Sequence, residues 1–121
     1  MEVRITDMVE SGGPYVVEVA GDIDIATVPE LEDPVIGAID SGLRPVILDL
    51  GECGFIDSSG IRLLVRAHHL LRGDSGNGHL MAIVARGQVA RLLDLTSVDK
   101  AIPVVGSRAE AESVLDLPAP A

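Results

Sequence analysis

The sequence predicts a single α/β domain in which a mixed, mostly parallel β-sheet is opened by a β-hairpin and covered by helices. Its 121 residues are a usual length for one domain, and no second segment is long enough to bury its own core. Two β-branched segments begin the chain, and short apolar runs then alternate with segments of helical periodicity. Such alternation implies right-handed crossovers between parallel strands. We expect the domain to cover residues 1–117 and residues 118–121 to form a frayed tail.

The opening hairpin is predicted from "EVRITDMV" (2–9) and "PYVVEVAG" (14–21), which are rich in β-branched residues. Gly12 and Gly13 lie between them and can adopt the positive φ of a tight turn. We therefore expect the two segments to pair as antiparallel strands.

The first helix is predicted within residues 24–42, where Thr27 is a possible N-cap, Asp24 is an alternative cap at the entry, and Gly42 marks the exit. Its apolar residues recur at helical spacing: Val28, Leu31, Val35, Ile36 and Ile39. Pro34 removes a backbone donor and clashes with the preceding turn. We expect a kink or a restart there, with Asp33 capping the second half.

A buried strand and a long helix follow in the middle of the chain. The run "RPVILDLG" (44–51) is typical of a strand covered on both faces. The segment 58–73 then has helical periodicity, and four of its apolar residues are expected to face the sheet: Ile61, Leu64, Val65 and Leu71.

The last third of the chain continues the alternation. "HLMAIVA" (79–85) predicts another buried strand, and residues 86–100 predict one helix. The inward residues of that helix are expected to be Val89, Leu92 and Leu93. Residues 101–105 predict a short edge strand, and residues 107–117 a last helix capped by Ser107.

The composition excludes several kinds of partner. With 19 acidic and 9 basic residues the formal net charge is −10, which repels nucleic-acid phosphates and anionic lipid surfaces. The first ten residues lack the features of a signal peptide, and no stretch approaches the ~20 apolar residues of a membrane span. We expect a cytoplasmic protein with no direct nucleic-acid partner and no membrane insertion.

Metal, cofactor and catalytic sites are not expected. Cys53 is the single cysteine, so it forms no internal disulfide or thiolate cluster and is interpreted as a packing residue. His68 and His69 are adjacent on a helix, so their side chains diverge by ~100°. The segment "GDSGNG" (73–78) looks superficially like the nucleophile loop of trypsin-type proteases, but its glycines favour a loop between helix and strand. The sequence therefore predicts no cofactor, no metal and no enzymatic activity.

The segment "DSSG" (57–60) lies where a strand pattern turns into a helix pattern, at the sheet edge where functional groups of such folds collect. Asp57 or Ser58 can cap the helix by accepting bonds from its first N–H groups. A cap does not account for Ser59 and Gly60, because glycine in a first turn weakens a helix. Hydroxyls, free N–H groups and a bare glycine could also hold a phosphate and admit a partner closely. These residues alone leave the capping and the phosphate-accepting interpretations equally open.

Three stretches make the chain resemble the anti-sigma-factor antagonists of the STAS domain family in bacteria: "VAGDIDIATVPEL", "VILDLGECGFIDSSGIRLL" and "RLLDLTSVDKAIPVV". The resemblance implies a STAS-like fold and a binding module that is phosphorylated by an anti-sigma factor with serine kinase activity and restored by a serine phosphatase. In its unphosphorylated form such a module binds the anti-sigma factor and so frees a sigma factor. By position, the resemblance makes Ser58 the phosphate acceptor. It also assigns a group of residues to the partner surface around that serine: Asp22, Asp24, Asp57, Ser58, Ser59 and Gly60.

Two positions depart from the family pattern. Pro34 interrupts a helix that is usually continuous, and Arg62 replaces the small residue often seen two positions after Gly60. Contacts along the second helix, and with them the partner, are therefore expected to differ. Some family members serve instead as non-catalytic scaffolds in stress-sensing assemblies or as subunits of lipid-transport complexes. That role is the alternative function, and a small hydrolase that uses Ser58 with a histidine is a third. The oligomeric state stays open.

Overall fold

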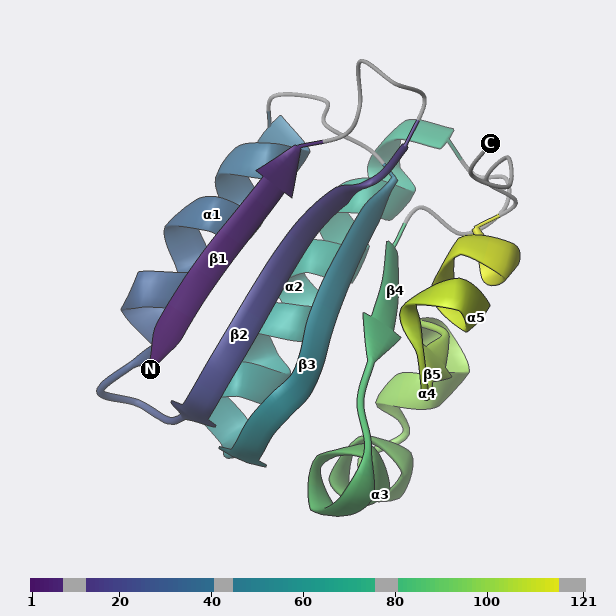
Figure 1. The fold of residues 1–121 in the computed structure, drawn as a ribbon. Coiled ribbons are helices and arrows are strands. Elements are labelled where there is room, and N and C mark those ends of the chain that lie inside the picture. Colours follow the sequence, from purple (N-terminus) through teal and green to yellow (C-terminus); the bar gives the residue numbers. More distant parts are fainter. Residues whose placement is uncertain (8–12, 41–44, 76–80, 116–121) are drawn as a thin grey trace.

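The computed structural model describes residues 1–7, 13–40, 45–75 and 81–115, which build a five-stranded sheet of order β1-β2-β3-β4-β5 (Figure 1). The strands are β1 (Glu2–Asp7), β2 (Tyr15–Ile23), β3 (Val46–Ile56), β4 (Met81–Val84) and β5 (Val104–Val105). β1 pairs antiparallel with β2, and every other neighbouring pair is parallel. The predicted mixed sheet with an opening hairpin is thereby confirmed. Gly12 of the predicted turn and the predicted tail at 118–121 lie outside the described residues.

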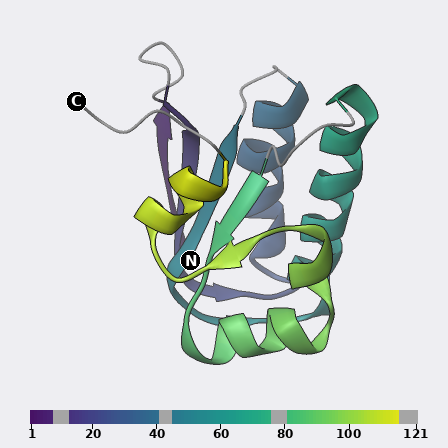
Figure 2. The ribbon, with the colours of Figure 1, turned by 90° about the vertical axis from the view of Figure 1, so that its right-hand side faces the viewer.

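Helices cover both faces of the sheet. They are α1 (Val28–Asp40), α2 (Ser58–Ser75), α3 (Gly87–Leu95), α4 (Val98–Ala101) and α5 (Arg108–Val114). α1 and α2 lie against one face and α5 against the other, while α3 lies at the edge of the sheet where β2 and β3 end (Figures 1 and 2). Among the described residues, no helix has both the length and the apolar character needed to cross a bilayer.

The sheet separates two apolar clusters of unequal size. The larger cluster joins the sheet to α1, α2, α3 and α4, and its fully buried members include Val17, Leu48, Ile83, Leu31, Leu64 and Leu93. The smaller cluster lies beneath α5 and consists of Val16, Ile47, Ala82, Val84, Ala111 and Leu115. Burying one such aliphatic side chain stabilises the fold by ~1.5–3 kcal/mol. The larger cluster therefore supplies most of the stability and holds the elements that end at the carboxyl edge of the sheet.

Pro34 does not divide the first helix, and the expected restart at Asp33 is wrong: α1 is continuous from Val28 to Asp40. A proline inside a helix costs ~3 kcal/mol. Leu31, Val35 and Ile39 are at most 4% exposed, so they anchor the helix to the sheet on both sides of the proline. Their burial offsets the lost hydrogen bond and keeps the helix whole.

The buried face of α2 differs in part from the predicted one. Val65 is 41% exposed, so the prediction that it faces the sheet is wrong. Among residues 58–70 of α2, whose side chains the structure describes, the buried ones are Gly60, Leu63, Leu64 and Ala67. They follow the i, i+3, i+4, i+7 spacing of one helical face, and Val65 lies ~100° away from Leu64 around the helix. The helix also continues to Ser75, so the prediction that a loop begins at Gly73 is wrong, and residues 76–78 of that prediction lie outside the described residues.

The single helix predicted over residues 86–100 is divided into α3 and α4. Thr96 is the C-cap of α3, and its N–H and its hydroxyl both donate to the carbonyl of Leu92, at 3.0 and 2.8 Å. Ser97 follows with a φ of 63°, in the left-handed region that interrupts a helix. Val89 and Leu93 are buried as predicted, and the change of direction lets Val98 of α4 enter the same core.

Two predictions for the end of the chain are confirmed. β5 is an edge strand paired with β4, although it is shorter than predicted. The Ser107 hydroxyl accepts a hydrogen bond from the N–H of Glu110 at 3.2 Å and so caps α5.

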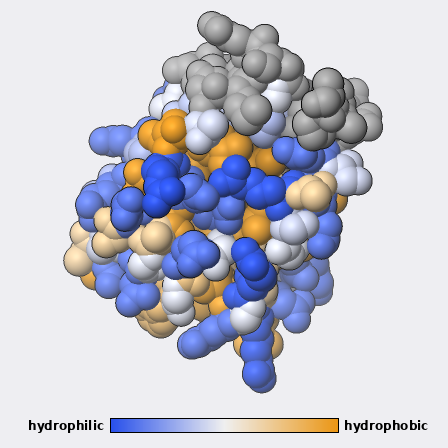
Figure 3. Space-filling model, viewed as in Figure 1, coloured by the Kyte–Doolittle hydropathy of each residue, from blue (hydrophilic) through white to orange (hydrophobic). Residues whose placement is uncertain are grey.

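The face of the molecule seen in Figure 3 is largely hydrophilic, with apolar residues exposed in places between the polar ones. Arg108 donates through Nη2 to Glu18 and through Nε to Asp49, at 2.8 Å in both cases. These two ion pairs join α5 to β2 and β3 across 90 and 59 positions of the sequence. The sequence analysis did not predict them, because nothing local to Arg108 indicates its partners.

Candidate functional site

The ends of β2 and β3 bring two loops together at one edge of the sheet. Ile23 and Ile56 are paired in the parallel register, and the N–H of Asp57 donates to the carbonyl of Ile23 at 3.0 Å. Between the pairs Glu18–Asp49 and Ile23–Ile56, β2 advances five residues and β3 seven, so β3 contains two bulges. Bulges bend a strand and increase its twist. They therefore set the direction in which β3 delivers the loop that follows it.

Asp57 is the residue that caps α2. Its Oδ1 accepts hydrogen bonds from the N–H groups of Ser59 at 2.8 Å and Gly60 at 3.4 Å, and its carbonyl accepts from Ile61 at 3.1 Å. The sequence left Asp57 and Ser58 as alternative caps, and the geometry selects Asp57. Ser58 therefore does not cap the helix but is its first residue.

Ser58 presents its hydroxyl to solvent. The residue is exposed, and its hydroxyl makes no hydrogen bond with any residue that the structure describes. Ser59, the next residue, is only partly exposed. Of the two adjacent hydroxyls, the one on Ser58 is thus better placed to react with an external group.

Gly60 is buried, and its missing side chain is explained by packing of α2 on the sheet. A Cβ at this position would lie 2.5 Å from Cγ1 of Ile56 and 2.8 Å from Cγ2 of Ile23. A residue with a side chain fits there only if the side chains of Ile56 and Ile23 move. The expectation that this glycine leaves bare backbone for a partner to approach is therefore replaced by a structural reason.

The loop between β2 and α1 is held by Asp24 and Thr27. Oδ1 of Asp24 accepts from the N–H groups of Ala26 at 2.9 Å and Thr27 at 3.0 Å. The hydroxyl of Thr27 accepts from the N–H of Asp24 at 2.9 Å and donates to the carbonyl of Asp22 at 2.8 Å. Of the two predicted caps, Asp24 and not Thr27 thus supplies the side-chain acceptor where α1 begins. The side chain of Asp22 makes no hydrogen bond or ion pair with the described residues, and Asp22 is exposed.

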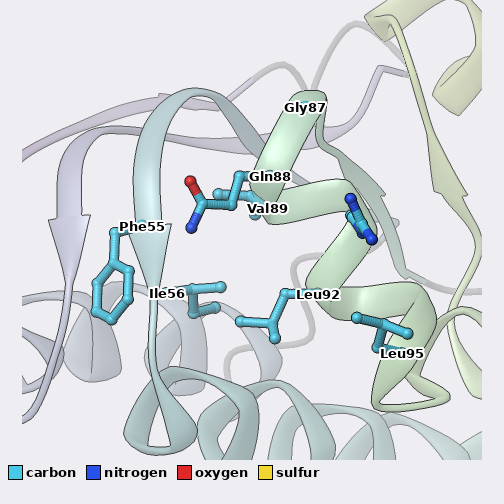
Figure 4. Close-up of a pocket in the computed structure, with 8 residues that line it drawn as sticks. Phe55, Ile56, Gly87, Gln88, Val89, Leu92 and Leu95 are labelled. Carbon is cyan, nitrogen blue, oxygen red and sulfur yellow. The ribbon is translucent and has the colours of Figure 1, made fainter.

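A largely apolar groove of about 630 Å³ lies between the end of β3 and α3 (Figure 4). Ile56 and Leu92 project toward one another inside it, and Phe55 lies at one side. Phe55 and Leu95 are large apolar side chains that line the groove and yet are 42% and 70% exposed. The sequence analysis missed this groove. Strict alternation along β3 would have placed Ile56 inward and Phe55 outward, but the contribution of α3 has no local signal.

Cys53 is confirmed as a packing residue. It is 7% exposed, burial raises the pKa of its thiol, and the thiol donates to the carbonyl of Phe55 at 3.2 Å. His68 and His69 have their ring centroids 5.9 Å apart. Within residues 1–7, 13–40, 45–75 and 81–115, no group of three or more His, Cys, Asp or Glu side chains is arranged to hold a metal ion.

The arrangement of these loops can be compared with known proteins. Residues 6–111 match the model of the STAS domain. The chain belongs to the STAS domain family. Over 84 residues this STAS protein is 31% identical to the anti-sigma-B factor antagonist of Staphylococcus epidermidis, an alignment that covers 69% of the chain and 76% of the relative.

Solved structures of STAS proteins share the fold. An anti-sigma factor antagonist from Mycobacterium paratuberculosis superposes with a TM-score of 0.82 at 27% identity, over 95% of this chain and 93% of that one. The Bacillus cell fate determinant SpoIIAA in its phosphorylated form superposes with a TM-score of 0.67 at 17% identity, over 93% and 97% of the two chains. The predicted STAS-like fold and the resemblance to anti-sigma-factor antagonists are both confirmed.

Proposed function

We propose that this STAS protein is an anti-sigma factor antagonist, a cytoplasmic binding module whose Ser58 is phosphorylated by an anti-sigma factor with serine kinase activity. The observation that carries the proposal is the position of Ser58, which is the exposed first residue of α2. Its hydroxyl makes no hydrogen bond with any residue that the structure describes. Two similar proteins support it, since the Staphylococcus relative is an anti-sigma-B factor antagonist and SpoIIAA, of the same fold, has a phosphorylated form.

The modification moves one phosphoryl group. The Ser58 oxygen forms a bond to the γ-phosphorus of ATP, and the bond between that phosphorus and the bridging oxygen breaks to release ADP. The hydroxyl proton passes to a base of the kinase, and a serine phosphatase later hydrolyses the ester. In this scheme the STAS protein supplies only the hydroxyl, and the nucleotide and the catalytic groups belong to the kinase.

The surface that binds the anti-sigma factor combines the loop of Ser58 with its neighbours. Exposed Asp22 and the part-exposed Ser59 supply polar groups, while Phe55 and Leu95 supply exposed apolar ones. Exposed apolar side chains of this kind commonly mark contact surfaces. Asp57 contributes mainly by shaping the loop, as its carboxylate is engaged with two backbone N–H groups.

Phosphorylation is expected to act as an on/off switch of binding. A phosphate adds ~−1.5 to −2 charges at pH 7, on a chain whose formal net charge is already −10. A bound surface that is apolar or acidic then meets both repulsion and the cost of desolvating the phosphate. A penalty of a few kcal/mol lowers affinity by ~100-fold or more. The unphosphorylated form therefore binds the anti-sigma factor and frees the sigma factor.

The test uses the kinase captured from the native cell extract on the unphosphorylated protein. After incubation with this kinase and ATP, mass spectrometry is expected to find phosphate on Ser58 of the wild type and of Ser59→Ala, and none on Ser58→Ala. Ser58→Asp is expected to bind the kinase ~100-fold more weakly than Ser58→Ala. Phosphate on Ser59 or Ser75 with Ser58 unmodified would contradict the assignment. Equal binding by Ser58→Asp and Ser58→Ala would favour the role of a non-catalytic scaffold subunit.

A further inference from the structure

We propose that Arg62 is the intramolecular partner of the phosphate on Ser58, and that it holds the phosphorylated form in a fixed arrangement. The inference rests on the proposed function for its biological meaning. It adds a role for a side chain at which this sequence departs from the small residue often seen in the family.

The positions of the two residues allow the contact. Ser58 is the first residue of α2 and Arg62 lies four residues later, so both are on the same side of the helix one turn apart. Side chains at i and i+4 have Cβ atoms ~5–6 Å apart. Both residues are exposed, so neither has to leave the core to reach the other. A guanidinium on its long side chain spans this distance and can donate two parallel N–H bonds to phosphate oxygens.

Arg62 is also available, in contrast to the next arginine of the helix. Arg66 donates to Glu32 of α1 at 2.7 Å. Arg62 makes no hydrogen bond and no ion pair with any residue that the structure describes. Its charge is therefore free to pair with a new anion one turn away.

The backbone N–H groups in the first turn of α2 are not enough to bind a phosphate on Ser58. The N–H groups of Ser59 and Gly60 already donate to Asp57, so a phosphate on Ser58 cannot use them without displacing that carboxylate. Asp57 itself repels the phosphate, and Asp22 and Asp24 add negative charge at the same edge of the sheet. Arg62 is the cation one helical turn from the hydroxyl, and pairing with it offsets this repulsion.

The pairing has a measurable consequence for the phosphate. A cation close to an acid favours its charged form, so Arg62 lowers the second pKa of the phosphoserine and keeps the dianion populated at neutral pH. The carboxylates of Asp22, Asp24 and Asp57 act in the opposite direction. Removing Arg62 therefore leaves their effect unopposed, and the phosphate retains its second proton to a higher pH.

The test is a ³¹P NMR titration of the full chain with phosphoserine installed at position 58 during synthesis, without any kinase. Arg62→Gln is compared with Arg66→Gln, which removes the same charge two turns from Ser58 instead of one. The second pKa of the phosphate is expected to rise by roughly 0.3 units or more in Arg62→Gln and by roughly 0.1 units or less in Arg66→Gln. Circular dichroism on each variant confirms that the fold is retained.

An unchanged phosphate pKa in Arg62→Gln, or equal rises in the two variants, would overturn the proposal, the second because it indicates only the loss of net charge. Since the phosphoserine is installed by synthesis, the titration does not depend on whether a kinase modifies Ser58. Failure of this inference and failure of the proposed function are therefore read from separate experiments.

Discussion

The loop Asp22–Thr27 and the loop Asp57–Gly60 share one hydrogen-bonding pattern, in which an aspartate accepts from backbone N–H groups. They differ in whether the nearby hydroxyl is hydrogen-bonded. In each, one carboxylate oxygen accepts from the N–H groups two and three residues later. The hydroxyl of Thr27, at the third position after Asp24, folds back and is held by backbone groups of the loop. The hydroxyl of Ser58, at the first position after Asp57, has no such bond among the described residues. With a similar cap, the hydroxyl is therefore either hydrogen-bonded to the backbone of the loop or exposed to solvent. Its position in the sequence relative to the aspartate determines which of the two occurs.

The largest loss of stability in the loop Asp57–Gly60 is expected when a side chain is added at Gly60. We expect Gly60→Ala to lower the free energy of unfolding by ~1–3 kcal/mol, because its Cβ would overlap Ile56 and Ile23. Urea denaturation measures the change. Gly37→Ala is the matched control, since a Cβ there has no neighbour within 4 Å in α1, and it should stabilise by ~0.5–1 kcal/mol. Equal effects of the two substitutions would show that packing does not explain Gly60.

Because Asp24 and Asp57 make the same pattern of hydrogen bonds, removing either carboxylate should lower the free energy of unfolding by a similar amount. Asp57→Ala and Asp24→Ala should each lower the free energy of unfolding by ~0.5–2 kcal/mol, the usual cost of losing a helix cap. Asp24→Asn keeps the Oδ1 acceptor and removes the charge, so it should unfold at nearly the wild-type temperature. Weaker binding of the anti-sigma factor by Asp24→Asn would assign a role to the charge itself. Normal binding would restrict Asp24 to shaping the loop.

The smallest expected changes in stability test the difference between the hydroxyls of Thr27 and Ser58. Thr27→Val loses the hydrogen bonds to Asp24 and Asp22 and should cost ~1 kcal/mol of stability. Ser58→Ala removes an exposed hydroxyl that holds nothing in the described structure, so its stability should stay within ~0.5 kcal/mol of the wild type. Thermal denaturation of both variants makes the comparison. A loss at Ser58→Ala as large as that at Thr27→Val would mean that Ser58 is structural.

Much of the fold could be predicted from local patterns, since alternation with period two and periodicity near 3.6 are properties of short segments. They placed the hairpin, the buried β3 and β4, and the start of α2 at "DSSG". The assignment of Ser58 as the phosphate acceptor came from the family resemblance and not from these patterns, and it stays a prediction. The choice of Asp57 as the cap was not local information, because aspartate and serine both cap helices and only the backbone geometry distinguishes them.

The sequence by itself therefore determined the order of the strands, the order of the helices apart from the division into α3 and α4, and the position of an acidic, serine-containing loop at the edge of the sheet. Only the tertiary structure decided that α1 continues through Pro34, that Gly60 faces Ile23 and Ile56, and that Arg108 joins α5 to two strands. It likewise decided that the Ser58 hydroxyl is presented while that of Thr27 is held. The physical reason is that each of these outcomes depends on burial and contacts between segments far apart in the chain. A local pattern records the preference of a segment, and the packing energy of its distant neighbours determines whether that preference is kept.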